Sequence, residues 1–252
     1  MYNCGEVAHL STGDDGIPLS GNRLLDRRSL VHPAGMGIII DNGGLIMKIA
    51  PMQDLLDEYA PWYPGKNESG DLRVIDVDGK AIVPGFVDSH THLVWSGDRS
   101  NELGMRISGK SYKDIAQSGG GIMKTVNSTR SAPQKQLVDS GVRRLETALI
   151  SGTTSLEAKS GYGLDLNSEV KLLESISIIN RSTPCDIRPT WLGAHDFPKE
   201  MTRDQYVEHL ISEQLPIISE LSLANWADVF CEEGWFTIEQ TEDIVTAANE
   251  FG

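Results

Sequence analysis

Residues 84–93 read PGFVDSHTHL, an apolar stretch followed by two histidines spaced by two. We expect a strand over residues 81–87, so that His90 and His92 follow at its end. Because strand side chains alternate between two faces, an i, i+2 pair points to one side of a sheet. Two imidazoles aimed at one point can bind a borderline metal such as Zn²⁺ or Fe²⁺. The alternative is a chance spacing of two histidines, and the Pro-Gly, the strand and Asp88 before the pair favour the metal site.

After this stretch, apolar segments alternate with amphipathic segments of helical length. This alternation predicts βαβ units and a parallel sheet. We expect strands over residues 153–158, 186–192 and 226–231, and helices over 131–150, 168–180, 203–221 (broken near Pro216) and 237–251, with Thr237 as N-cap.

Residues 1–82 predict a small β-rich domain, separate from residues 83–252. Two apolar runs flank Asn42-Gly43 within residues 37–50, which indicates a hairpin because Asn and Gly tolerate the positive φ of a tight turn. We further expect a short helix over residues 51–59, a surface loop over 61–70 and a second hairpin from 73–77 and 80–83.

Residues 83–252 contain only four β/α units, whereas an eightfold barrel needs about 250 residues. The chain therefore predicts either a small open α/β sheet or the first four units of an incomplete (β/α)8 TIM barrel. The residues at the strand ends favour the barrel.

Two further side chains follow predicted strands, where the loops of parallel α/β folds build binding sites. Tyr162 lies between two glycines after the strand at 153–158, and His195 follows the strand at 186–192. Glu157 and Lys159 share a strand face and are expected to form an ion pair. Arg99, in the loop after the two histidines, suits a substrate carboxylate because its guanidinium is a planar fork. The alternatives are a Gly-rich turn with an exposed Tyr and a solvated Arg.

The composition excludes several functions. The chain has 252 residues with 22 basic and 36 acidic side chains, a net charge of −14. This argues against nucleic acid and polybasic membrane contacts, which need a basic face. Three widely spaced cysteines suggest neither a disulfide framework nor a Cys zinc site. With no signal peptide and no membrane span evident, we expect a cytoplasmic protein.

Residues 84–92 resemble the first barrel strand of the amidohydrolase superfamily. Within that superfamily the chain is similar to the imidazolonepropionase family, with an ordered match from about residue 82 to 252. The resemblance rests on HTHLVWSGDR at 90–99, GGGI at 119–122, EAKSGYGLD at 157–165, LGAH at 192–195 and VFCE at 229–232.

The resemblance implies a distorted TIM barrel with a β-sandwich, and hydrolysis of 4-imidazolone-5-propanoate to N-formimidoyl-L-glutamate in histidine catabolism. It implies that His90 and His92 are ligands of one divalent metal, Zn or Fe. Arg99, Tyr162 and His195 match substrate-binding residues, with Arg99 and Tyr162 near the propionate and His195 polarising the lactam carbonyl. The family's fifth-strand His with the acid/base group that follows it, and its eighth-strand Asp, have no counterpart here. A homodimer is compatible with this assignment.

Two alternatives stay open. The first is another amidohydrolase, such as a deaminase or a dihydroorotase-like enzyme, against which the Ser160–Gly163 loop and Gly193–His195 weigh. The second is a non-catalytic α/β fragment or binding module whose histidines bind nothing.

Overall fold

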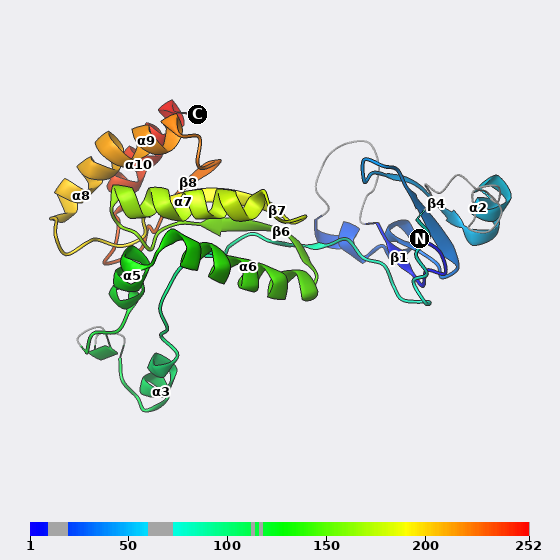
Figure 1. Cartoon of the computed structure of the whole chain (residues 1–252), viewed down its shortest axis with the longest axis horizontal. Helices are drawn as coiled ribbons and strands as arrows, with labels where there is room; N and C mark the ends of the chain where they lie inside the picture. The colour runs from blue at the N-terminus through cyan, green and yellow to red at the C-terminus, as the bar shows by residue number, and fades with distance from the viewer. Residues whose placement is uncertain (10–19, 60–72, 112–113, 116–117, 252) are drawn as a thin grey trace. The chain divides into compact units, whose positions relative to one another are not determined.

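A computed structural model describes residues 1–9, 20–59, 73–111, 114–115 and 118–251 (Figure 1). The chain divides into two compact units, Met1–Pro84 and Gly85–Gly252. The boundary predicted from the sequence lies between residues 82 and 83. The surface loop predicted at 61–70 lies outside the described residues.

Among its described residues, the first unit forms two small antiparallel sheets. The predicted hairpin at 37–50 is confirmed, because β3 (Met36–Ile40) pairs with β4 (Ile46–Pro51). At its turn the Asp41 carboxylate accepts hydrogen bonds from the N–H groups of Gly43 and Leu45, at 2.9 and 2.8 Å. The predicted helix at 51–59 is also confirmed. The remaining elements are β1 (Val7–Ala8), β2 (Val31–His32), η1 (Gly21–Leu25), α1 (Arg27–Leu30) and α2 (Met52–Tyr59).

The second predicted hairpin, from 73–77 and 80–83, is wrong. Asp78 and Gly79 do form a turn with positive φ, but the two arms do not pair with each other. Their backbone groups bond to the N-terminal segment instead, with Tyr2 N–H donating to Ile75 O and Ile82 N–H donating to Glu6 O. The turn residues are a local signal, whereas this partner lies more than 70 positions away.

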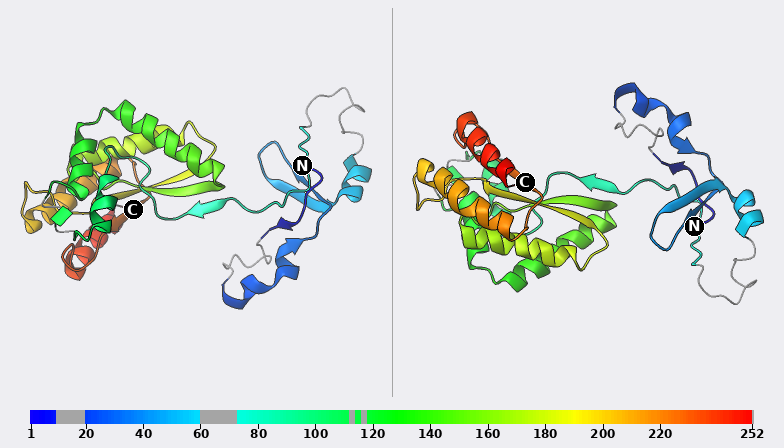
Figure 2. Two further views of the ribbon diagram at one scale, coloured as in Figure 1. Left: turned by 90° about the horizontal axis from the view of Figure 1, so that it is seen from below. Right: turned by 90° about the horizontal axis from the view of Figure 1, so that it is seen from above.

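The second unit is built on a four-stranded sheet in the order β5-β6-β7-β8, with every neighbouring pair parallel (Figure 2). The predicted α/β class is confirmed, and the sequential parallel order fits part of a TIM barrel. The strands are β5 (Phe86–Asp88), β6 (Thr153–Lys159), β7 (Asp186–Ala194) and β8 (Trp226–Val229). The helices among its described residues include α3 (Asn101–Ile107), α5 (Ile122–Ser131), α6 (Gln134–Ile150), α7 (Leu166–Asn180), α8 (Arg203–His209), α9 (Leu215–Glu220) and α10 (Ile238–Glu250).

Several element boundaries differ from the prediction. The helix expected at 131–150 begins at Gln134, because Pro133 is its extended N-cap. The break expected near Pro216 in the helix over 203–221 is confirmed, because a π-helical segment, η3 (Leu210–Gln214), separates α8 from α9, and Pro216 lies in the first turn of α9. The strand expected over 81–87 is shorter, because β5 begins only at Phe86 and ends at Asp88, and the two histidines follow it as expected. Thr237 caps α10 as predicted, accepting a hydrogen bond from Gln240 N–H.

The core lies between the sheet and its helices, with buried side chains from α6 through α10. On β6, Leu156 and Ala158 are buried in this core with Leu137, Leu145 and Ile176. The alternating residues Glu157 and Lys159 share the other face of the strand. The sheet therefore has one apolar face against helices and one face with charged side chains.

For the segments described, every helix is too short or too polar to traverse a lipid bilayer.

Candidate active site

The candidate site lies where the strands of the parallel sheet end. Tyr162 follows β6, His195 is the first residue after β7, and Phe230 is the first residue after β8. Parallel strands end at one edge of a sheet, so these side chains come from one end of the fold.

Arg99, Tyr162 and His195 line one pocket of about 310 Å³. The structure thus brings together the three side chains predicted to bind substrate, and this role stays a prediction. The sequence analysis missed the other lining residues, which are Ile122, Asp196, Phe230 and Trp235. Asp196 and Phe230 could have been found from their places at strand ends.

His92 packs against this pocket. Its ring stacks on His195 with centroids 4.8 Å apart and planes inclined by 12°, and lies 4.7 Å from the Tyr162 ring. Burial, together with the nearby His195, lowers the pKa of His92 to about 3. Nδ1 of His92 is buried and has no hydrogen-bond partner among the described residues. A neutral imidazole with an unpartnered nitrogen is the form that binds a metal.

His90 is exposed, and its backbone N–H lies 3.4 Å from the Asp88 carboxylate. A charge on His90 would lower the pKa of both His92 and His195, so the three imidazoles lie within electrostatic reach of one another. Between the two histidines, Thr91 keeps contact with β6: its carbonyl accepts from Lys159 N–H at 2.9 Å.

The described donor atoms fit the predicted metal site only in part. In the part of the chain that the structure describes, no group of three or more His, Cys, Asp or Glu side chains is placed to hold a metal ion. A catalytic zinc site normally has three protein ligands. His92 has a nitrogen without a hydrogen-bond partner, as a metal ligand needs. His90 and His92 together would supply two metal ligands, which is only part of such a set.

Arg99 is held by a protein carboxylate. Its Nε and Nη2 donate to Glu102 at 3.0 and 2.9 Å, and Gly121 N–H donates to the same carboxylate at 2.8 Å. The Arg99 hydrogen bonds lower the pKa of Glu102, which is buried. Glu102 was missed in the sequence, although it follows Arg99 by only three residues; Arg99 precedes α3, and Glu102 lies in the first turn of that helix. Arg99 also acts on Tyr162: burial raises the pKa of Tyr162, and the charge of Arg99 opposes that rise.

His195 is oriented by the loop that carries Tyr162. Its Nδ1 lies 2.8 Å from the carbonyl oxygen of Gly161, so Nδ1 carries the proton and donates. In a neutral ring, Nε2 then has a lone pair and accepts hydrogen bonds. Burial lowers the pKa of His195, which favours this neutral form.

A buried ion network lies on the charged face of the sheet. Lys159 Nζ is 3.1 Å from Glu157 and 2.6 Å from Asp228, which confirms the predicted ion pair and adds a second carboxylate. Burial lowers the pKa of Lys159, but the two carboxylates outweigh this and leave it raised. The network ties β6 to β8.

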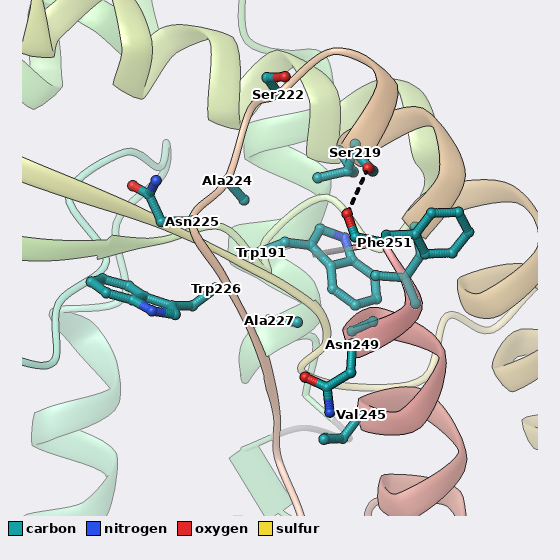
Figure 3. Close-up of a pocket in the computed structure, with 13 residues that line it drawn as sticks. Trp191, Ser219, Ser222, Ala224, Asn225, Trp226, Ala227, Val245, Asn249 and Phe251 are labelled. Atoms are coloured by element: carbon teal, nitrogen blue, oxygen red, sulfur yellow. Dashed lines mark hydrogen bonds between the residues drawn. The ribbon is translucent and has the colours of Figure 1, made fainter.

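A second hollow, of about 470 Å³, lies beside β8, α9 and α10 (Figure 3). Its lining includes Trp191, Trp226 and Phe251, and none of its lining side chains is ionisable. Trp226 is the first residue of β8, so this hollow is not at the strand ends that carry the histidines. It offers no acid, base or metal ligand.

The fold and these strand-end side chains define an α/β protein with a strand-end pocket, lined by both apolar and charged or polar side chains, of the kind that βα barrels build. No family model matches the chain. It is 40% identical to an imidazolonepropionase of Symbiobacterium thermophilum, over 100% of this chain and 56% of that protein. Imidazolonepropionases of Haloarcula marismortui and Alkaliphilus metalliredigens are 38% and 46% identical, over 90% and 75% of this chain and 52% and 44% of theirs.

The chain is a homologue of the imidazolonepropionases. It spans about half the length of the curated relatives that it matches.

Proposed function

We propose that this chain supplies the N-terminal part of a metal-dependent amidohydrolase that opens 4-imidazolone-5-propanoate to N-formimidoyl-L-glutamate in histidine catabolism. The observation that carries this proposal is the single pocket of Arg99, Tyr162 and His195, with His92 stacked against it. The names of the relatives support it. The proposal includes a barrel of the amidohydrolase type, a small β-sandwich formed with the first unit, and a cytoplasmic location.

The substrate is an anion with a cyclic amide. We propose that Arg99 binds the propionate, since a guanidinium pairs with a carboxylate through charge-assisted hydrogen bonds. Glu102 and Gly121 fix the Arg99 side chain before substrate arrives, which places the ring of a bound molecule near Tyr162 and His195. The Tyr162 hydroxyl, with its pKa raised by burial, stays protonated and can donate to the substrate.

We propose that His195 forms a hydrogen bond with the lactam. With Nδ1 donating to Gly161, its neutral Nε2 accepts from a lactam N–H, and only the imidazolium form donates to the carbonyl oxygen. Polarisation of the carbonyl, which the resemblance implies, therefore requires a second proton on the His195 ring.

His90 and His92 would hold one divalent metal, Zn or Fe. When bound, such a metal supplies acidified water and a polarised carbonyl. The further ligands and the acid/base group implied by the family have no counterpart in this sequence.

Ligand binding tests the proposal without requiring turnover. We expect 3-(imidazol-4-yl)propionate, a stable ring with the same propionate, to bind the 252-residue chain in calorimetry. Arg99→Gln should weaken this binding at least about tenfold, because it removes the charge that pairs with the carboxylate. The control Arg143→Gln changes an exposed Arg of α6 and should have no effect.

A second arm addresses turnover. The chain is mixed with the segment of the Symbiobacterium thermophilum relative that lies beyond the matched part, and release of N-formimidoyl-L-glutamate is measured. No binding in the first arm and no turnover in the second would reject the proposal and favour a non-catalytic module. Turnover of a different cyclic amide or an aminopurine would favour another amidohydrolase.

A further inference from the structure

The loop that carries Tyr162 is held by a buried carboxylate. Glu169, in the first turn of α7, is fully buried. Its Oε1 accepts from Gly163 N–H at 2.7 Å and from Leu164 N–H at 2.9 Å, and its Oε2 accepts from Gly161 N–H at 2.9 Å. One side chain thus binds three backbone groups within four residues of the loop.

This loop has a conformation that it would not keep unaided. Leu164 has φ of 56° and Gly161 has φ of 105°, both in the left-handed half of the backbone map. A non-glycine residue at positive φ costs of order 1–3 kcal/mol and persists only when its surroundings hold it. The N–H groups of both residues are bonded to Glu169, so its carboxylate opposes relaxation of the loop.

The loop in turn fixes two walls of the pocket. Tyr162 lies between the two glycines that Glu169 binds, and the Gly161 carbonyl holds Nδ1 of His195. A Cβ on Gly161 would lie 2.8 Å from that Nδ1, which shows how closely this backbone approaches the ring.

The charge on Glu169 matters as well as its shape. Charge-assisted hydrogen bonds are about twice as strong as neutral ones, and the N-terminus of α7 also favours a negative charge. Burial raises the pKa of Glu169, while the hydrogen bonds from the loop oppose that rise. A Gln in its place has one acceptor oxygen, so its NH₂ group would face either Gly161 N–H or the N–H groups of Gly163 and Leu164.

We propose that Glu169 is a positioning residue of this site: its carboxylate binds the 161–164 loop and thereby sets both the Tyr162 ring and the tautomer of His195. The assignment to substrate binding rests on the proposed function. The effect on His195 does not, because the contacts through Gly161 lie within the chain itself.

Glu169→Gln tests this in the 252-residue chain. We expect the ¹⁵N NMR signals of His195 to change from the Nδ1–H tautomer to a mixture, because Gly161 is released. We also expect the affinity for 3-(imidazol-4-yl)propionate to fall about tenfold, in proportion to the loss of one charge-assisted hydrogen bond. The control Glu174→Gln lies on the same helix, is exposed and contacts Gln134, and should change neither signal.

Each result decides the proposal. A folded Glu169→Gln variant with unchanged His195 signals would overturn it. If Glu169→Gln does not melt cooperatively, Glu169→Asp is measured in the same way, because it keeps the charge on a shorter side chain. Loss of folding in both variants would show that Glu169 is needed for folding, and this would also overturn the proposal. If the unmodified chain binds no probe and the mixture with the relative's segment shows no turnover, the proposed function fails, and the His195 signals alone decide the role of Glu169.

Discussion

The guanidinium of Arg99, just before α3, and the carboxylate of Glu102, in the first turn of α3, form two hydrogen bonds of 3.0 and 2.9 Å. The pair places a charged side chain at the pocket wall and anchors it with a carboxylate that is only 5% exposed.

This pair predicts how stability depends on pH. The folded-state pKa of Glu102 is lowered by Arg99, so below the unfolded pKa near 4.5 the unfolded chain binds more protons. The stability that Glu102 contributes is therefore complete above that value and is lost as the pH falls through the lowered folded pKa. Urea unfolding between pH 7 and pH 3 should show a shallower loss for Glu102→Gln than for the unmodified chain. Parallel curves for the two proteins would contradict this.

A metal should bind through His92. Calorimetric titration of Zn²⁺ into the metal-free chain should give a binding isotherm, and His92→Asn should weaken it at least about tenfold, because the unpartnered Nδ1 is lost. His32→Asn, in the first unit, serves as the control and should leave the isotherm unchanged. Equal binding by the two variants would mean that Zn²⁺ binds elsewhere.

Lys159 should be more important to stability than Asp228. Lys159→Met leaves the carboxylates of Glu157 and Asp228 without their cation, and removing one partner of a buried pair costs about 3–5 kcal/mol. Asp228 is 40% exposed, so Asp228→Asn should cost about 1 kcal/mol or less. Urea unfolding of both variants measures the difference. A larger loss for Asp228→Asn would show that Glu157 contributes little to the network.

Gly161 should tolerate no side chain. In Gly161→Ala the new Cβ would lie 2.8 Å from Nδ1 of His195 and 2.9 Å from Leu192 O, in a backbone with φ of 105°. Gly109 has a similar φ of 88° but no neighbour within 4 Å, so Gly109→Ala isolates the backbone strain, at about 1–2 kcal/mol. We expect the loss for Gly161→Ala to exceed this by about 2 kcal/mol in thermal unfolding. Similar losses would mean that His195 moves away without cost.

The alternation of strands and helices after residue 84 could be predicted because it depends on local periodicity. Helix starts followed local chemistry too, as at Thr237. The second hairpin could not be predicted, since the pairing of residues 75–82 is decided by the distant N-terminal segment. Helix α5 and the π-helical form of η3 were not predicted from the sequence.

Part of the candidate site could also be predicted from the sequence. Tyr162 and His195 follow strands, so their positions in the chain indicate one end of a parallel sheet. The carboxylates behind them were missed because a Glu in a helix is usually solvated. Glu102 has a sequence signal in its spacing from Arg99, whereas Glu169 binds backbone N–H groups, which leave no pattern in the side chains.

In the described sheet, β5 and β8 are the two outer strands, and this position favours association between copies of the chain. An outer strand offers backbone N–H and C=O groups on one side, which a strand of another molecule can pair with. On β5, Phe86 and Val87 are 60% and 73% exposed, which adds apolar area to such a contact. The net charge of −14 repels one copy from another. Self-association of the 252-residue chain should therefore increase with protein concentration and with added salt, which screens that repulsion.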